Sequence, residues 1–444
     1  MELLQTAFSM LEKYALCDHC LGRQFALLGH GVENDERGRS IKLALTMMAH
    51  AGLSTDDKVY LKRLRVIAVN GFSKAALETL EQTKKHLSTW DLKKSCFLCE
   101  DSLDKLDILV EKSLNLLGEY EYSNFLVGTE LPTTVEERED EFRAEFNVQY
   151  GEDLRNEFGR LIGKRIAESN GKPVEFMRPE VVVLTNPFAG RVRLQVNPLF
   201  LAGRYRKLVR GIPQSKWFCR SCRGKGCEKC GWTGKMYPES VEEIIGKSIL
   251  EATGGSKSSF HASGREDIDA RMLGSGRPFV IEIAEPKRRS LNIKKLEKTV
   301  NAFGRRKVQV SGLKLAHKEA VRKLKQGESK QKEYRVLIEF DKKISPQDLQ
   351  VLKEKLKNVS VDQKTPVRVL HRRADLMREK YIYDVNIRKM APKKAEMKIR
   401  CQGGLYVKEL VTGDEGRTTP SVTGILNNKA TPLKLDVLRI IMKE

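Results

Sequence analysis

The sequence contains no apolar run long enough to cross a lipid bilayer, which takes about 20 consecutive apolar residues in a helix. An export signal is also missing, because residues 1–16 include Glu2, Glu12 and Lys13 and resemble the start of an amphipathic helix. There is no internal repeat and no low-complexity tract. We therefore expect a cytoplasmic protein without a membrane partner, and nothing in the sequence demands more than a monomer.

The motifs of two enzyme classes that act on nucleosides or RNA are missing as well. Zinc nucleoside deaminases need His-x-Glu together with Pro-Cys-x-x-Cys. Here His261 is followed by Ala262 and Ser263, and no Cys-x-x-Cys pair follows a proline. A methyltransferase needs a glycine-rich cofactor loop directly after a strand, whereas Gly274-Ser-Gly276 is too short and follows a charged segment. The sequence gives no sign of an organic cofactor.

Acidic residues are scarce relative to basic ones. The 444 residues include 81 Lys and Arg against 59 Asp and Glu, a formal net charge of +22, and 40% are hydrophobic. This composition is typical of a globular protein, and the length suits two or three domains. The positive surplus favours a polyanionic partner such as nucleic acid.

The surplus is concentrated between residues 285 and 330, which contain 15 Lys and Arg, four Glu and no Asp. Ile293, Leu296, Val300 and Phe303 recur at helical spacing, so we expect a folded helix whose lysines are exposed. Two interpretations are open, namely lysines that face phosphate groups and an ordinary solvated helix face.

Eight of the nine cysteines form four Cys-x-x-Cys pairs. The pairs are Cys17/Cys20, Cys96/Cys99, Cys219/Cys222 and Cys227/Cys230, and Cys401 stands alone. Two-residue spacing lets both thiolates of a pair bind one tetrahedral zinc ion, and a single pair is an incomplete ligand set. The last two pairs lie among glycines in a zinc-knuckle pattern, and a long insert separates the first two. We predict two closed, structural zinc sites. The redox alternative lacks its βαβ pattern.

Hydrophobic patterns divide the chain into four regions, which we predict as a helical zinc-binding region at 1–100, a second module at 101–215, the zinc knuckle at 216–237 and a third domain at 238–444. Expected strands are 123–131, 181–185, 191–196, 279–284, 306–315, 334–340, 367–370, 379–385, 397–401 and 433–441. Many strands with few parallel βαβ units indicate an α+β fold.

The most informative segment is the turn Gly264-Arg-Glu-Asp267. A glycine-permitted bend can bring the Arg265 guanidinium close to the Asp267 carboxylate. A carboxylate held beside a cation stays ionised at neutral pH and can act as a nucleophile. The structural alternative is an Asp that caps a turn.

A second segment combines three cations with an aromatic ring. It consists of Arg204, Tyr205, Arg206 and Lys207. This mixture suits phosphate contact and base stacking, so we predict RNA-binding residues here. An ordinary basic turn is the alternative.

Several segments carry a family resemblance. Ser263–Phe279 resembles the active-site segment of the tenth pseudouridine synthase family, which consists of tRNA-modifying enzymes of archaea and eukaryotes. Segments similar to the same family are 197–200, 203–213, 363–375, 404–409 and 413–421, together with the first two cysteine pairs. The resemblance covers nearly the whole chain. Lys364 stands where the family pattern has Arg.

The resemblance implies a pseudouridine synthase catalytic domain with a mostly antiparallel mixed sheet, and a THUMP-like RNA-binding module upstream. The implied substrate is uridine 54, uridine 55 or both in the T-arm of tRNA, without an organic cofactor. Asp267 corresponds to the nucleophile. The implied substrate-binding residues are Arg265, Tyr334, Tyr406, Lys408 and Leu435. Arg265 would help to hold the target base, and Tyr334 would pack on the uracil. Lys408 would pair with Asp267, and Leu435 would form part of the apolar wall.

A non-catalytic, zinc-stabilised protein that binds tRNA or rRNA is the main alternative. Asp267 would then have a structural role only. Grouping of Asp267, Tyr334 and Lys408 around one cleft distinguishes the enzyme from this binding protein.

Overall fold

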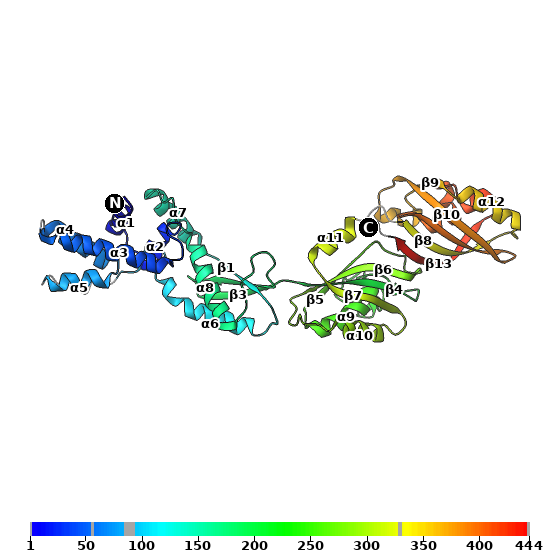
Figure 1. Cartoon of the computed structure of the whole chain (residues 1–444). Coiled ribbons are helices and arrows are strands. Elements are labelled where there is room, and N and C mark those ends of the chain that lie inside the picture. The colour runs from blue at the N-terminus through cyan, green and yellow to red at the C-terminus, as the bar shows by residue number, and fades with distance from the viewer. Residues whose placement is uncertain (1, 55–56, 84–93, 327–330, 442–444) are drawn as a thin grey trace. The chain divides into compact units, whose positions relative to one another are not determined.

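The structure, a computed structural model, describes residues 2–54, 57–83, 94–326 and 331–441 (Figure 1). The chain divides into two compact units, Met1–Asn197 and Pro198–Glu444, called unit 1 and unit 2 below. Among the helices of the described ranges, none combines the length and the apolar composition that a bilayer-spanning helix needs.

Unit 1 combines helices with a small sheet. Its helices are α1 Glu2–Lys13, α2 Asp18–Gly22, α3 Asn34–Ala51, α4 Asp57–Val69, α5 Lys74–Gln82, α6 Leu106–Leu117, α7 Thr133–Glu145 and α8 Leu154–Asn170. Its strands are β1 Phe125–Thr129, β2 Val181–Asn186 and β3 Arg191–Val196. β2 lies between the other two, parallel to β1 and antiparallel to β3.

One hydrophobic core joins the N-terminal helices of unit 1 to the part that contains its sheet. It includes Leu11 and Leu64 from the N-terminal helices, Phe142 from α7, Ile162 from α8 and Val181 from β2. α6 packs on β3 and α8 packs on β1, so helices cover the small sheet. Residues on both sides of position 100 therefore belong to one packed body.

Unit 2 contains a large sheet with helices packed on it (Figure 1). Its strands are β4 Leu199–Lys207, β5 Lys257–Ala262, β6 Arg271–Ala284, β7 Val308–Ala316, β8 Gln331–Phe340, β9 Val359–Lys364, β10 Met377–Ala391, β11 Lys394–Gln402, β12 Thr418–Thr419 and β13 Ala430–Ile441. Its helices are α9 Val241–Thr253, α10 Ile293–Phe303, α11 Lys318–Gln326, α12 Pro346–Leu356, α13 Val407–Thr412 and α14 Val422–Leu426.

The sheet order is β12-β9-β10-β11-β8-β13-β6-β4-β7, with β5 also paired to β6. Among the described strands of this sheet, β6 and β13 are parallel and the other neighbours are antiparallel. This confirms the predicted α+β class with a mostly antiparallel mixed sheet. α9 and α10 pack on the β4–β6–β7 part around Ile281, while α12 to α14 pack on the β8–β11 part around Met397.

β6 joins these two parts of the sheet. Arg271 and Met272, at its start, pair with β13, whereas residues 279–284 pair with β5 on the same edge. The other edge of β6 pairs with β4. The loop 263–270 connects β5 to the start of β6. It therefore lies where the strand paired with this edge of β6 changes from β13 to β5.

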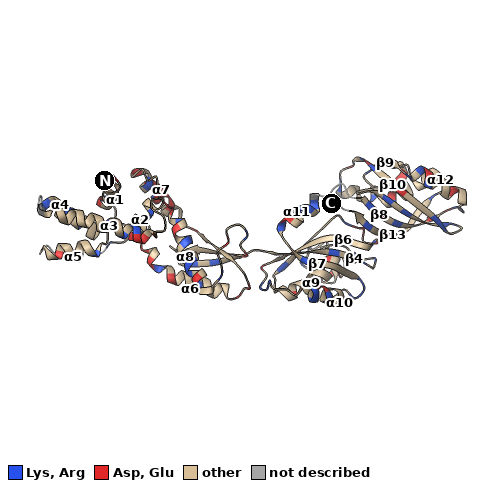
Figure 2. Cartoon of the chain, in the orientation of Figure 1, with Lys and Arg blue, Asp and Glu red and all other residues tan. Residues whose placement is uncertain are grey.

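The cationic helix expected at 293–303 is present as α10. The Asn292 side chain accepts a hydrogen bond from the Lys295 backbone at the helix start, as an N-terminal capping residue does. Leu296 and Val300 are buried, whereas Lys294, Lys295 and Lys298 are exposed. Figure 2 shows Lys and Arg residues in blue on the ribbon of α10.

Three elements of unit 2 are among those that differ from the sequence-based expectation. Residues 199–207 are strand β4 in the large sheet, so the boundary between the units precedes β4 rather than following residue 215. Residues 271–278, expected outside a strand, begin β6. Residues 367–370, expected as a strand, belong to the 3₁₀ helix η5 Val367–Arg372, which Pro366 precedes. Pro366 lacks the N–H that a strand ladder needs.

Gly274 provides a test of the close packing between the start of β6 and β13. Its φ is +56°, and a Cβ added to it would lie 2.0 Å from the carbonyl oxygen of Leu438 in β13. Gly312 in β7 has a φ of +64° and nothing within 4 Å of an added Cβ. We expect Gly312→Ala to cost only backbone strain, about 1–2 kcal/mol, and Gly274→Ala to cost ~3 kcal/mol or more, because the β13 backbone must also move.

Hydrogen exchange of the β6 and β13 amides in the full chain measures this difference. Gly312→Ala is the matched control, since it repeats the strain without the clash. Equal protection losses in the two variants would contradict the close packing of β6 on β13.

Candidate active site

Unit 2 has a cavity beside the loop 263–270. Its volume of about 540 Å³ falls in the range of small-ligand sites. Asp267 from the loop, Tyr334 from β8 and Lys408 from α13 all line it. Its wall also contains Trp217, Arg265, Arg368, Arg373, Tyr406 and Leu435.

Two cations face the Asp267 carboxylate. Its Oδ2 lies 3.3 Å from Nζ of Lys408 and 3.3 Å from Nη2 of Arg368. The Asp267 side chain is 35% exposed, so a ligand in the cavity can reach it. Lys408 also lies 2.7 Å from Asp269. Burial by itself would raise the pKa of Asp269, but the hydrogen bond and charge of Lys408 hold it below its usual value.

One short helix holds both cations in place. Lys408 is the second residue of α13, and the backbone of Tyr406 before it is bound by the side-chain amide of Gln363 at 2.9 and 3.1 Å. Arg368 lies in η5 and donates from Nε to Oε1 of Glu409 at 2.6 Å. Glu409 directly follows Lys408, so the Arg368 and Lys408 contacts to Asp267 are set by adjacent residues.

A buried polar network supports the loop from below. Glu266, next to Asp267, accepts from Arg277 Nε at 2.8 Å and from the Tyr205 hydroxyl at 2.9 and 3.0 Å. Arg277 also donates to the Ser263 carbonyl at 2.7 Å. Glu266, Arg277 and Tyr205 are at most 5% exposed. Gly264 bends with a φ of +80°, which favours glycine at this position.

Lys207 fixes the backbone of the same loop. This fully buried lysine donates from Nζ to the carbonyl oxygens of Asp267 and Ile268, both at 3.1 Å, and of Ile212 at 2.9 Å. Burial lowers the pKa of Lys207 to about 8.

A carboxylate surrounded by arginines anchors the end of the loop. Asp436 of β13 accepts hydrogen bonds from Arg210 at 2.5 Å and from Arg271 and Arg335 at 2.9 Å. Burial alone would raise the pKa of Asp436, but these guanidinium groups lower it to about 2. Arg210 also donates to the Asp269 carbonyl at 2.7 Å, which links this cluster to the loop.

Tyr334 and Leu435 contribute to the apolar portion of a largely charged and polar wall. Tyr334 packs against both cores of unit 2, and burial raises the pKa of its phenol, so the hydroxyl is neutral at physiological pH. Leu435 is 9% exposed and lies on β13. The Tyr406 hydroxyl accepts a hydrogen bond from Arg373 at 2.9 Å. A planar, uncharged ring such as a nucleobase would suit this surface.

Cys17, Cys20, Cys96 and Cys99 meet in unit 1. Their Sγ atoms all lie within 4.8 Å of one another, and Cys17 and Cys99 are 3.7 Å apart. A tetrahedral zinc ion with Zn–S distances of about 2.3 Å places its sulfurs about 3.8 Å apart. Backbone N–H groups of Cys17 and Cys20 point at sulfur atoms of the cluster. The four cysteines therefore fit a zinc ion.

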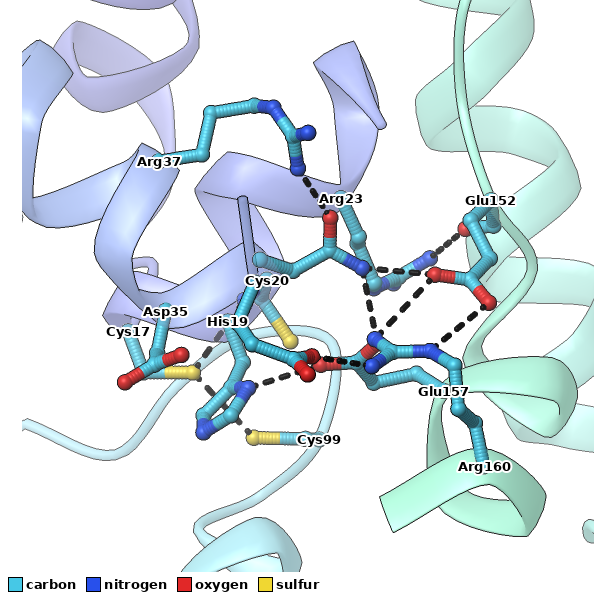
Figure 3. Close-up of polar contacts among 12 residues, drawn as sticks. Cys17, His19, Cys20, Arg23, Asp35, Arg37, Cys99, Glu152, Glu157 and Arg160 are labelled. Carbon is cyan, nitrogen blue, oxygen red and sulfur yellow. Dashed lines mark hydrogen bonds and ion pairs between the residues drawn. The ribbon is translucent and has the colours of Figure 1, made fainter. Parts of the chain in front are cut away.

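Polar contacts of His19 and Arg23, beside this cysteine cluster, reach α7 and α8, and Figure 3 shows Glu152 and Glu157 on that side. His19 Nδ1 lies 2.7 Å from Oε1 of Glu157 on α8. Arg23 is fully buried, pairs with Glu139 on α7 and donates to the Glu152 carbonyl at 3.1 Å. The cluster thus lies where the N-terminal helices pack against the sheet-bearing part of unit 1.

The other four cysteines meet in the knuckle at 216–237. Their sulfurs again lie within 4.8 Å of one another, with 3.9 Å between Cys219 and Cys227 and between Cys222 and Cys230. Backbone N–H groups of Gly226 and Gly234 donate to sulfurs at 3.2 and 3.3 Å. This donor set also fits zinc, so both cysteine clusters have the geometry that the sequence predicted.

Comparison with known proteins identifies relatives over the full length. The family models "Pus10, C-terminal" and "Pus10 THUMP domain, archaeal" match residues 200–441 and 109–186. The tRNA pseudouridine synthase Pus10 of Methanocaldococcus jannaschii is 44% identical, covering 98% of this chain and 93% of that protein. Proteins of the same name from Methanothrix thermoacetophila and Thermofilum pendens are 39% and 36% identical, covering 99% and 97% of this chain and 94% of each protein.

The chain belongs to the Pus10 family. This confirms the resemblance to the tenth pseudouridine synthase family. The Pus10 C-terminal match begins at residue 200, close to the start of unit 2, and the Pus10 THUMP match spans α6 to β2 of unit 1. Among solved structures there is a weak likeness to a Cbf5-Nop10-Gar1 complex, with 13% identity, 55% of this chain and 50% of that chain covered, and a TM-score of 0.30.

The structure brings together the side chains that the Pus10 resemblance singled out. Asp267, Arg265, Tyr334, Tyr406, Lys408 and Leu435 line one cavity. The expected pairing of Lys408 with Asp267 is present. The guanidinium of Arg265 lies over the Trp217 ring, 4.8 Å from its centroid. The roles of these residues in a reaction stay predictions.

The prediction for the segment 204–207 needs correction. Tyr205 and Lys207 are fully buried and bind the loop 263–270, so they cannot stack on bases or contact phosphates. Strand alternation sends these two side chains inward. Arg204 and Arg206 point to the other face, where Arg204 donates to the Ser275 and Gly276 carbonyls and Arg206 to Gln309. RNA contact by these two arginines stays a prediction.

Three of the site residues without a role in the sequence-based hypothesis hold or face the Asp267 loop. They are Arg368, Glu266 and Arg277. Arg368 stands in a segment that carries the family resemblance, and this was its only signal. Glu266 and Arg277 are charged residues in a segment expected to lie outside any strand, where exposure is the usual expectation.

The buried pair under the loop can be tested by stability. Glu266→Gln keeps the shape but leaves Arg277 charged without its anion, so we expect a loss of about 3–5 kcal/mol in the free energy of unfolding. The matched control is Glu339→Gln, since Glu339 pairs with Lys394 at the surface and should matter by less than about 1 kcal/mol. Urea unfolding of the full chain measures both. A Glu266→Gln cost as small as that of the control would contradict the supporting role of the pair.

Proposed function

We propose that this protein is a tRNA pseudouridine synthase that isomerises uridine 54, uridine 55 or both in the T-arm, with Asp267 as the nucleophile. The observation that carries the proposal is the cavity of the Pus10 C-terminal region, in which one carboxylate faces two cations beside a neutral tyrosine. Full-length relatives named tRNA pseudouridine synthase support the substrate class.

In the proposed reaction, the Asp267 carboxylate attacks C1′ of the uridine, and the bond from C1′ to N1 breaks as the uracil leaves with its electron pair. The freed uracil turns in the cavity, and its C5 then attacks C1′ and displaces Asp267. The C5 proton is lost and N1 gains a proton, so the product is an isomer of the substrate. Nothing is oxidised or hydrolysed, so the reaction needs no organic cofactor.

The surrounding side chains suit this sequence of steps. Lys408 and Arg368 compensate the charge of Asp267 before attack and after its release. Tyr334 and Leu435 offer an apolar surface on which the freed uracil can turn while remaining shielded from water. Arg265, held over Trp217 at the cavity wall, is suited to keeping the target nucleotide out of its helix.

Access to the base requires flipping, since the T-arm uridines lie within folded tRNA. Extrusion of a base costs on the order of a few kcal/mol, and binding of the remaining tRNA can offset that cost. A net charge of +22 and the THUMP region at 109–186 support a large tRNA contact. We propose that the protein works on tRNA as a monomer in the cytoplasm, with a structural zinc ion in each cysteine cluster.

Replacing the nucleophile tests the function directly. We expect Asp267→Asn to lower the rate of pseudouridine formation on an unmodified tRNA transcript by at least ~10³-fold, with tRNA affinity nearly unchanged, because the amide cannot form the bond to C1′. Pseudouridine mapping at each T-arm position and tRNA binding are measured side by side. A retained rate would exclude Asp267 as nucleophile. Wild-type protein that binds tRNA tightly but forms no pseudouridine would favour the non-catalytic RNA-binding alternative.

The second cation on Asp267 can be tested in the same assay. Arg368→Gln should lower the single-turnover rate by about 10–100-fold while changing tRNA affinity little, because it removes one of the two cations that face the reacting carboxylate. Arg388→Gln is the control, since Arg388 pairs with Glu396 on the sheet and is mostly exposed. Equal rates for the two variants would remove Arg368 from the mechanism.

A further inference from the structure

The zinc knuckle at 216–237 forms part of the cavity wall. Trp217, near its start, lines the same cavity as Asp267. The Trp217 ring lies under the Arg265 guanidinium and makes an edge contact with Tyr237 at the other end of the knuckle, with 5.7 Å between the ring centroids. Whatever the knuckle binds is therefore close to the ligand of the cavity.

The knuckle is fixed to unit 2 at its base. The N–H of Met236 donates to the Trp217 carbonyl at 2.9 Å, and that of Cys219 donates to the Gly234 carbonyl at 2.8 Å, which closes the base. The Lys216 N–H donates to Glu242 of α9 at 3.2 Å, and Lys235 pairs with the adjacent Glu243. These contacts hold the knuckle in a set direction beside the cavity.

The outer surface of the knuckle is basic. Arg220, Arg223, Lys225 and Lys229 are exposed, and within the described part of the chain none of the four takes part in an ion pair. Glu228 is the only acidic residue between positions 216 and 237, which also contain Lys216 and Lys235. The knuckle stays net positive even when four thiolates and a divalent zinc ion are counted. A purely structural role of the knuckle would not explain why these four cations are present.

Two aromatic rings are exposed on the same small element. Trp232 is 75% exposed and Phe218 is 56% exposed. Trp232 also has a φ of +62°, in the left-handed region that glycine adopts more easily. A bulky, solvent-facing ring is thus present at a position where glycine would cost less. Exposed aromatic rings beside cations are the surface on which unpaired nucleobases stack.

We propose that the knuckle is a second RNA-binding element, which holds the nucleotides that flank the target uridine. Trp232 stacks on a base, and Arg220, Arg223 and Lys225 contact neighbouring phosphates. This inference rests on one part of the proposed function, namely that the ligand of the cavity is a nucleotide of an RNA chain. The zinc ion would keep the Cys219–Cys230 loop folded so that these side chains face the RNA together.

A charge-removal experiment tests the phosphate contacts. The triple variant Arg220→Ala, Arg223→Ala, Lys225→Ala is compared with Lys343→Ala, Lys353→Ala, Lys355→Ala, which removes the same charge from exposed positions at and near α12. Binding of an unmodified tRNA transcript to the full chain is measured against salt concentration. Each lost phosphate contact reduces the salt slope by about 0.9 on a log–log scale. We expect the knuckle variant to lose about 2–3 units of slope and to bind at least ~10-fold more weakly, and the control to match wild type.

A second pair of variants tests the stacking. Trp232→Ala should weaken tRNA binding by roughly tenfold without changing the salt slope, because a base–aromatic contact is lost and no phosphate contact is affected. Trp232→Phe should restore most of the affinity, which a merely structural role of Trp232 would not require. Zinc content near two ions per chain, measured for every variant, shows that the knuckle is still folded.

The outcomes separate this inference from the proposed function. If the knuckle variants bind tRNA like the control, the knuckle is only a support for the cavity wall and the inference is wrong, whatever the activity. If binding depends on the knuckle but wild-type protein forms no pseudouridine, the RNA-binding role stands and the catalytic proposal fails.

Discussion

The site depends on an ion pair that water does not reach. Glu266 and Arg277 lie 2.8 Å apart and are nearly fully buried beneath the loop that carries Asp267. A buried pair contributes little net stability, but it is costly to break, so it restricts the chain to conformations in which both charges are satisfied. Because Glu266 is held inward, its neighbour Asp267 is directed to the cavity. Tyr205 and Lys207 of β4 serve the same end, so these two buried side chains support the loop rather than bind RNA.

Because buried residues fix the loop 263–270, the charged side chains that line the cavity are held close together. Asp267 contacts Lys408 and Arg368, while Tyr334 and Leu435 add an apolar surface to the same wall. Such a site suits the proposed reaction, in which charge moves between a carboxylate, a ribose carbon and a leaving base. The cations elsewhere on the protein are then available for tRNA, whose binding has to offset the cost of exposing one base.

The sequence predicted what depends on local pattern or on a complete ligand set. The strands expected at 181–185 and 191–196 are present as β2 and β3, and the two distant cysteine pairs meet because neither alone can complete a tetrahedral site. It missed β4, since a strand that buries Tyr205 and Lys207 lacks the usual apolar alternation. Arg368 was missed for another reason. Its contact with Asp267 joins residues 101 positions apart and exists only once the sheet has formed.

A structure of the protein bound to a T-arm RNA with 5-fluorouridine at the target position would test the central claim most directly. The fluorine replaces the proton that must leave C5, so the rearranged nucleotide is retained. We expect the nucleotide to be extruded into the cavity, with C1′ in contact with the Asp267 carboxylate and the base against Tyr334. A uridine that stays stacked in the T-arm, or that occupies a pocket away from Asp267, would contradict the account.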